Sequence, residues 1–162
     1  MVVGRCAAAL LLLVVAGCGR GAAAVPEKVQ VAVGSEKVDL QPTQFCLDGE
    51  GQRYDTAPPI LEVSPGSTIT LTVPDSVAQQ GWSVQVFDEK LEEQLGAVDV
   101  PAGDAVFDGI NTSDVVPPAF YLVVVEDKGG ACGSFTGAWP VGFLRAGGSL
   151  GGTPSSSTPA AG

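Results

Sequence analysis

Apolar and polar residues alternate along much of the chain. In the segment 68–73, three apolar residues alternate with three threonines, and in 28–33 valines occupy every second position. Successive side chains of a β-strand point to opposite faces of a sheet, so a period of two predicts strands with one buried face. No stretch of comparable length has the period of a long helix.

Weaker versions of the same pattern predict further short strands between turns. Glycine and proline mark turns at Gly34-Ser35 and Pro65-Gly66, the second suited to a type II turn. The segment 120–126 is apolar on both faces, which predicts a central strand. One helical turn is expected over 74–81, with Asp75 as its N-cap and Gly81 as its stop. The remaining predicted strands are 37–40, 60–63, 82–87, 96–100, 104–109 and 138–145.

These elements together predict an all-β fold. Short strands with turns every 8 to 12 residues or so, each with one apolar face, favour an antiparallel immunoglobulin-like β-sandwich of about eight strands. The term immunoglobulin-like refers to architecture only. A small β-barrel fits the same pattern and is the alternative fold.

The N-terminal apolar run differs from the strands. Residues 6–17 are apolar and follow a short segment that carries Arg5. A helix of this length spans roughly 18 Å, against about 30 Å of bilayer hydrocarbon. The run is therefore too short to cross a membrane, and a charged start, an apolar centre and small residues before a cleavage point are typical of a secretory signal peptide.

The end of this run carries a more specific motif. Val15-Ala16-Gly17-Cys18 resembles the lipobox of bacterial lipoprotein precursors. The resemblance implies that diacylglycerol is attached to the Cys18 thiol and that cleavage leaves Cys18 as the first mature residue. Membrane lipid is then a partner of the chain, and two acyl chains are enough for stable anchoring. The alternative is an ordinary signal peptide with an incidental cysteine.

Four regions follow from these patterns. Residues 1–17 are predicted to be a lipoprotein signal peptide, 18–27 a lipidated tether, 28–145 the β-sandwich domain, and 146–162 a disordered Gly/Ser/Thr/Pro tail. The expected location is the outer face of the cytoplasmic membrane, which is an oxidising setting.

The charge and the missing residue types narrow the possible functions. The chain has 18 Asp and Glu against 8 Lys and Arg, a net charge of −10, so its surface repels nucleic-acid phosphates and no nucleic-acid partner is expected. Histidine is absent. The commonest general base and the usual zinc and copper ligand are thereby removed, which argues against a blue-copper site. We expect no cofactor, no metal and no catalytic residue.

Two cysteines are left once Cys6 is removed with the signal and Cys18 is acylated. An even pair in an exported domain most often forms a disulfide, so Cys46 and Cys132 are predicted to be bridged. Two free thiols or a redox pair are the alternatives, although the chain has no thioredoxin-like C-x-x-C motif.

Several of these segments together resemble a known family. Pro42-Thr43-Gln44-Phe45-Cys46, the stretch 61–74 and Trp82, with the lipobox before them, are similar to an actinobacterial lipoprotein family of unknown function. The resemblance implies a lipid anchor and a β domain with two cysteines. It implies no activity.

Two acidic segments are the remaining candidates for chemistry. Residues 88–93 contain Asp88 and Glu92, and residues 104–114 contain Asp104 and Asp108. Their oxygens suit calcium, but the first segment lacks the alternating ligand order and the central glycine of an EF-hand loop. A solvated hairpin tip and turn-forming residues are the preferred interpretation.

The sequence thus favours a non-enzymatic, lipid-anchored binding or scaffold domain at the bacterial cell envelope. Its partner is an unknown envelope protein, wall polymer or lipid, and its oligomeric state stays open. The alternative is an envelope hydrolase or a calcium-dependent module that uses surface carboxylates.

Overall fold

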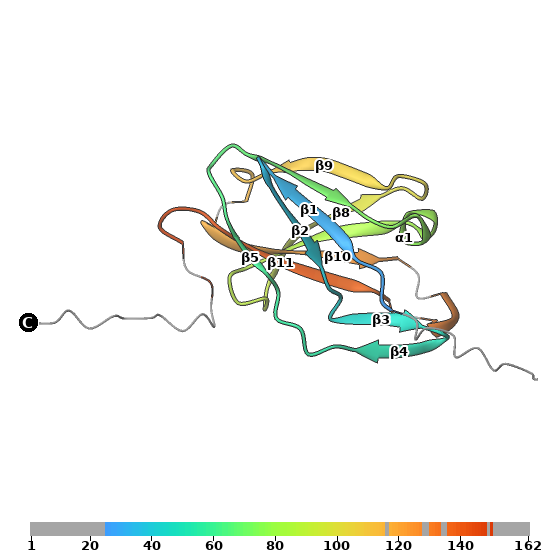
Figure 1. Ribbon diagram of the computed structural model, residues 1–162. Helices are drawn as coiled ribbons and strands as arrows, with labels where there is room; N and C mark the ends of the chain where they lie inside the picture. The colour runs from blue at the N-terminus through green and yellow to red at the C-terminus, as the bar shows by residue number, and fades with distance from the viewer. Residues whose placement is uncertain (1–24, 116, 128–129, 134–135, 149, 151–162) are drawn as a thin grey trace, which may run out of the picture.

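Two β-sheets pack face to face in the computed structural model, which describes residues 25–115, 117–127, 130–133, 136–148 and 150 (Figure 1). The predicted antiparallel sandwich is confirmed, and one short helix accompanies it. No helix in the described ranges is long and apolar enough to cross a membrane.

The first sheet has four strands in the order β2-β1-β6-β9. Every pairing in it is antiparallel, and Val31 of the inner strand β1 lies opposite Val38 on one side and Leu71 on the other. The alternation seen in the sequence therefore places one apolar row toward the second sheet. The four strands are β1 (Val29–Val33), β2 (Glu36–Leu40), β6 (Thr68–Thr72) and β9 (Val106–Asn111).

The second sheet has seven strands. Six follow the order β4-β3-β11-β10-β7-β8, and β5 pairs with β11 in parallel. The segment predicted to be central is β10, which lies between β11 and β7. The seven strands are β3 (Gln44–Leu47), β4 (Glu50–Arg53), β5 (Ile60–Glu62), β7 (Trp82–Phe87), β8 (Gln94–Val100), β10 (Ala119–Glu126) and β11 (Ala138–Leu144).

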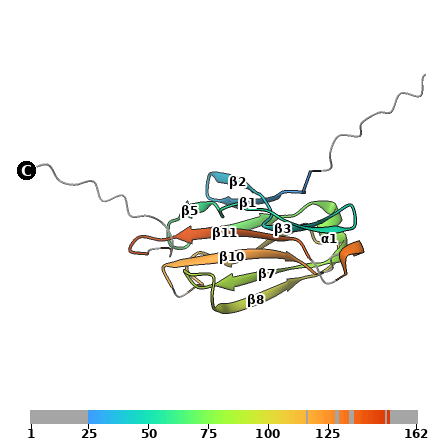
Figure 2. The same cartoon turned by 90° about the horizontal axis from the view of Figure 1, so that it is seen from below.

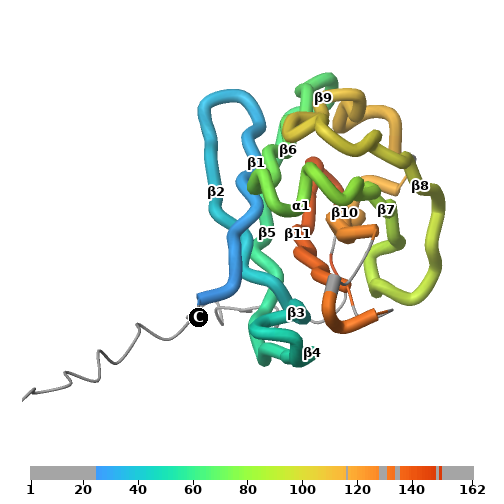
Figure 3. Tube along the Cα trace, turned by 90° about the vertical axis from the view of Figure 1, so that its right-hand side faces the viewer, coloured from blue at the N-terminus to red at the C-terminus, as the bar shows by residue number. Residues whose placement is uncertain are grey.

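Figure 2, turned by 90°, shows β11, β10, β7 and β8 of the second sheet side by side, with β1 and β2 of the first sheet above them. The strands β8 and β9 are consecutive in the chain but belong to different sheets, so the segment 101–105 carries the chain from one layer to the other. Seen from the end, β8 and β9 lie along one side of the sandwich, and the hairpin β3–β4 lies away from them (Figure 3).

Aromatic side chains fill the space between the layers. Trp82, Trp139, Phe120 and Phe143 have no exposed surface. The rings of Phe120 and Phe143 stack with their centres 5.2 Å apart, and the Trp82 indole N–H donates to the Asp104 carbonyl oxygen over 2.7 Å. Because a buried indole N–H without a partner is costly, this hydrogen bond allows the ring to lie in the core.

The short helix agrees with the sequence at its end but not at its start. Helix α1 spans Asp75–Gln80, and Gly81 ends it with a φ of 85°, as expected. The predicted N-cap was wrong, because Pro74 occupies that position and no side chain caps the helix. Asp75 lies instead in the first turn, where its negative charge interacts favourably with the helix dipole.

The number of strands was underestimated. The described residues form eleven strands rather than about eight, and the two strands of the hairpin β3–β4 are those for which no segment was predicted. Its side chains are half-buried or exposed, so they show no apolar alternation. The signal that would have revealed it is the dipeptide Asp48-Gly49, which forms the turn with φ values of 52° and 81° and is typical of a two-residue hairpin loop.

The domain is also longer at both ends than predicted. Glu27 accepts a hydrogen bond from the Trp139 indole, so the sandwich already holds the end of the proposed tether. At the other end Leu150 is buried against Ala119 and Tyr121, beyond the predicted boundary at residue 145. The predicted signal peptide, Cys18 and the tail after Leu150 lie outside the described residues.

Candidate functional site

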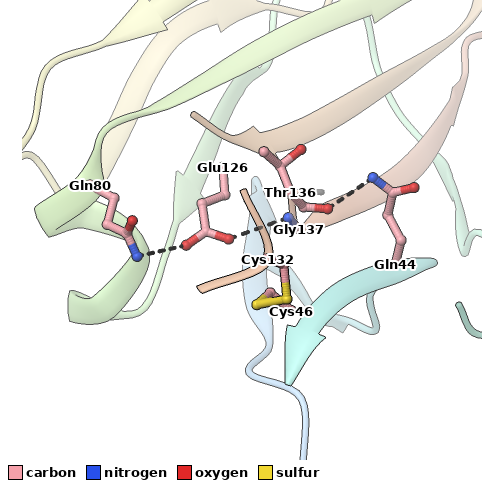
Figure 4. The surroundings of a disulfide bond; sticks show 7 residues. All are labelled: Gln44, Cys46, Gln80, Glu126, Cys132, Thr136 and Gly137. Atoms are coloured by element: carbon pink, nitrogen blue, oxygen red, sulfur yellow. Dashed lines mark hydrogen bonds between the residues drawn. A yellow bond between two sulfur atoms is a disulfide. The ribbon is translucent and has the colours of Figure 1, made fainter. Parts of the chain in front are cut away.

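The disulfide expected from the sequence is present between Cys46 and Cys132. It joins β3 to the short 3-10 helix η1 (Gly130–Cys132), and the two Cα atoms are 5.8 Å apart. Among the described residues, one register pair, Gln44 and Ala138, joins β3 to β11, and the backbone N–H of Thr43 donates to the Ala138 carbonyl oxygen over 2.9 Å. The Gln44 amide also donates to the Thr136 carbonyl oxygen over 2.8 Å (Figure 4). The disulfide therefore secures a hairpin that its sheet contacts hold only weakly.

An open groove of about 340 Å³ lies beside this disulfide. Sequence reasoning did not bring its residues together, because they come from the N-terminal segment, α1, β3, β10 and η1. The groove is lined by Val25, Glu27, Phe45, Cys46, Leu47, Gly49, Ser76, Gln80, Glu126 and Ala131.

Glu126 is the unusual residue of this groove. It is the last residue of β10 and only 5% exposed. Its carboxylate accepts hydrogen bonds from the Gln80 side chain at 3.2 Å and from the Gly137 backbone N–H at 3.3 Å, as Figure 4 shows. Burial raises the pKa of Glu126, the N–H of Gly137 opposes that rise, and the negative charge of Glu27 adds to it.

Glu27 holds the N-terminal segment against the groove. The Ser76 hydroxyl donates to its carboxylate, and the Trp139 indole N–H donates to its backbone carbonyl oxygen over 2.9 Å. The groove thus contains two carboxyl groups and one hydroxyl, all engaged in hydrogen bonds that stabilise the fold. The signal that would have found Glu126 is an acidic residue at the end of an otherwise apolar strand.

The first acidic segment predicted from the sequence forms the tip of the β7–β8 hairpin. Asp88 accepts hydrogen bonds from the backbone N–H groups of Glu92 and Glu93 at 2.8 and 3.1 Å. The bond from Glu93 is the main cause that lowers the pKa of the Asp88 carboxyl. Asp88 therefore stabilises a turn, which agrees with the preferred interpretation from the sequence.

The second acidic segment is also organised by turns. Asp114 accepts a hydrogen bond from the Asn111 N–H at 2.7 Å, and the Asn111 side chain accepts one from the Ser113 N–H at 2.9 Å. Asp104 and Asp108 are exposed. Within the described ranges, no three His, Cys, Asp or Glu side chains gather in a way that would hold a metal ion.

A second groove opens on the side of the sandwich between β8 and β9. It measures about 410 Å³ and is mostly apolar. Its walls include Val86, Val98, Ile110, Val115 and Pro117, with Asp114 at its edge. Sequence reasoning treated these strands as weak and did not anticipate the groove, because the separation of the two edge strands is a property of the assembled layers.

Comparisons with known proteins place the chain in a family without assigning it an activity. No curated protein and no solved structure matches it. One family matches residues 23–129 and is described as a protein of unknown function, DUF2771. The matched part runs from before β1 through β10 and includes Cys46, whereas Cys132 and β11 follow it. Since the match covers about two thirds of the 162 residues, the chain belongs to the DUF2771 family.

Proposed function

We propose that this protein is an exported, lipid-anchored binding or scaffold domain at the outer face of a bacterial cytoplasmic membrane. The observation that carries the proposal is Val15-Ala16-Gly17-Cys18, placed where a short apolar run ends. Diacylglycerol on Cys18 is the anchor, and the protein is one of the actinobacterial lipoproteins. Its partner is an envelope protein, a wall polymer or a lipid.

The positions of the chain ends support a defined orientation on the membrane. Val25 lines the groove at the disulfide end, and seven residues reach at most about 25 Å, so Cys18 keeps this end close to the bilayer. Leu150 packs against Ala119, which begins β10, so it lies at the end of the sandwich opposite Glu126, the last residue of that strand. The turn at 64–67 and the loop at 112–115 also lie there, joined by the Thr112 hydroxyl, which donates to the Ser64 carbonyl oxygen.

The chemistry of the carboxylates supports binding without turnover. Asp88 and Asp114 accept hydrogen bonds within their own turns, and Asp104 and Asp108 are exposed. The chain has no histidine to serve as a general base. The proposed role therefore depends on surfaces rather than on a reactive centre.

Crosslinking in living cells followed by affinity capture of the full membrane-bound chain tests this proposal. We expect a discrete partner to be captured by the wild-type chain and to be lost when Cys18→Ala releases the domain from the membrane. A Lys37→Gln variant, changed at an exposed position of β2, serves as the matched control. Recovery of the same partner from both anchored and released chains would contradict a role that depends on the anchor.

The groove beside the disulfide favours an envelope hydrolase as the second candidate. Glu27 and Glu126 both line it, and glycosidases use pairs of carboxyl groups in which one has a raised pKa. Loss of the cellular phenotype in a folded, exported Glu126→Gln variant would favour this candidate over binding alone.

A further inference from the structure

The groove between β8 and β9 lies between two strand edges that have no neighbour among the described residues. Strand β8 pairs only with β7, and β9 only with β6. The unpaired N–H and C=O groups of an edge strand form a ready template for another strand. Six of the seven residues of β8 are exposed, so no described segment covers this edge.

The space beside β8 is open and apolar. A side chain added at Gly96 would meet no atom within 4 Å, although Gly96 lines the groove. Val98 is 40% exposed. It lies opposite Val84 of β7, and because Val84 is a core residue, the side chain of Val98 is on the face of β8 that is turned toward the interior. The groove is therefore able to receive further apolar side chains without displacing those present.

Acidic residues prevail along the strands that border the groove. From Leu91 to Asp127 the sequence contains no lysine or arginine. Asp99, Asp104, Asp108 and Asp114 are distributed over β8, β9 and their adjoining loops. Arg145 donates to the carbonyl oxygens of Val115 and Pro117, two residues that line the groove.

We propose that this groove binds an extended segment of a partner protein in which cationic and apolar residues alternate. The segment adds to the free edge of β8 as a new strand. Its apolar side chains, which recur every 6.6 to 6.8 Å or so along one face, enter beside Gly96 and Val98, and its cations lie near Asp99 of β8 and Asp114 at the edge of the groove. A second copy of this chain does not fit, because its net charge of −10 would be repelled. The proposal rests on the binding function above and specifies the class of partner.

A peptide titration tests the proposal with the full chain in nanodiscs of phosphatidylcholine. The probes are twelve-residue peptides in which lysine alternates with valine, leucine or phenylalanine, and matching peptides with glutamate in place of lysine. Calorimetry should detect saturable binding of at least one lysine peptide, weakened by added salt, and no binding of the glutamate peptides. Absence of binding by every lysine peptide would overturn the proposal.

Two variants locate the site. Gly96→Val fills the open space without changing charge and should weaken binding by about tenfold or more, the effect of removing one good anchor. Gln85→Val adds the same side chain on β7 but on the opposite face, because Gln85 lies between the inward-facing Val84 and Val86, and should leave binding unchanged. Equal binding by wild type and both variants would place the peptide elsewhere and overturn the proposal.

Peptide backbone methylation tests strand addition independently of any variant. Methyl groups on every second backbone nitrogen block hydrogen bonding along one edge of an extended peptide. Two such peptides are compared, one methylated at the odd positions and one at the even positions. One of them should not bind, and the other should bind as the unmethylated peptide does. Equal affinity of the two methylated peptides would exclude a strand pairing. If cell-based capture still yields a partner that the lysine peptides fail to displace, the proposed binding function stands and this inference alone fails.

Discussion

The indole N–H of Trp139 donates to the backbone carbonyl oxygen of Glu27 over 2.9 Å, although 112 positions separate the two residues in the sequence. Trp139 is a fully buried residue of β11, and Glu27 lies just before β1. The segment that leads from the proposed anchor is therefore fastened directly to the core.

Trp139→Phe should release the segment at Glu27, because phenylalanine keeps an aromatic ring in the core but has no N–H to donate. We expect a loss of roughly 1 kcal/mol from the hydrogen bond, together with a packing loss from the smaller ring. Hydrogen exchange should become faster at the start of β1, the strand that follows this segment. Tyr121→Phe, which changes a buried aromatic residue of β10 outside this contact, is the control, and unchanged exchange in the Trp139 variant would show that the contact does not hold the segment.

Cys18→Ala should release the protein from the membrane and prevent acylation. The expected readouts are a shift of the protein from the membrane to the soluble fraction and the absence of the lipid mass from the intact protein. Cys6→Ala, which lies within the predicted signal peptide, should change neither readout. Membrane retention and unchanged mass in the Cys18 variant would contradict the predicted anchor.

Replacement of Cys46 and Cys132 by serine should lower the melting temperature without changing the fold. The bridge spans a sequence separation of 86 residues, for which the chain-entropy model gives an upper value of about 4–5 kcal/mol. The hairpin β3–β4 should lose its protection from exchange first, since the few hydrogen bonds that Thr43 and Gln44 make to Ala138 and Thr136 are its remaining connection to the start of β11. Peptide mapping of the exported protein without reductant checks the pairing, and two free thiols would contradict it.

Glu126→Gln should change the pH dependence of stability. Burial raises the pKa of Glu126 in the folded state, so its contribution to stability is fully present below the ordinary glutamate pKa of 4.5 and is lost as the pH rises through the folded value. Glutamine does not ionise. Its oxygen is able to accept from the Gly137 N–H, and its NH2 group is able to donate to the Gln80 side-chain oxygen once the Gln80 amide turns over. The variant should therefore be more stable than wild type at neutral pH.

The difference in unfolding free energy between this variant and wild type, measured across the pH range, checks the prediction. Glu50→Gln, at an exposed position of β4, is the matched control and should show no such trend. A constant difference between the Glu126 variant and wild type would mean that Glu126 does not titrate in this window.

Single carboxylate-to-amide changes at Asp104 or Asp108 should leave the cellular phenotype unchanged, because both side chains are exposed and the proposed function involves no turnover. The same change at Asp88 should loosen the β7–β8 hairpin tip without loss of function, and Glu92→Gln should have little effect. Phenotype rescue assays with checks of export and folding measure these outcomes. Loss of function from one amide change in a folded, exported protein would favour catalysis or metal binding.

Much of the fold follows from the local pattern of the chain. The alternation in β1 and β6 determines which residues face the second sheet, and the apolar run in β10 predicts its central place, because both depend on side-chain direction along one strand. The turn at Pro65-Gly66 and the helix end at Gly81 depend on backbone angles that local sequence also determines, and both glycines have positive φ. The disulfide was predictable from the number of cysteines and the expected compartment.

The candidate sites depend on tertiary structure. Glu27 and Glu126 share a groove only because α1, β3 and β10 meet at one end of the sandwich, and no local signal measures that distance. The groove beside Gly96 exists because β8 and β9 enter different sheets, which leaves two strand edges apart. The alternation along a strand determines the direction of each side chain. Whether a carboxylate is buried, and whether a space stays open between the layers, depends on which strands become neighbours in the folded protein.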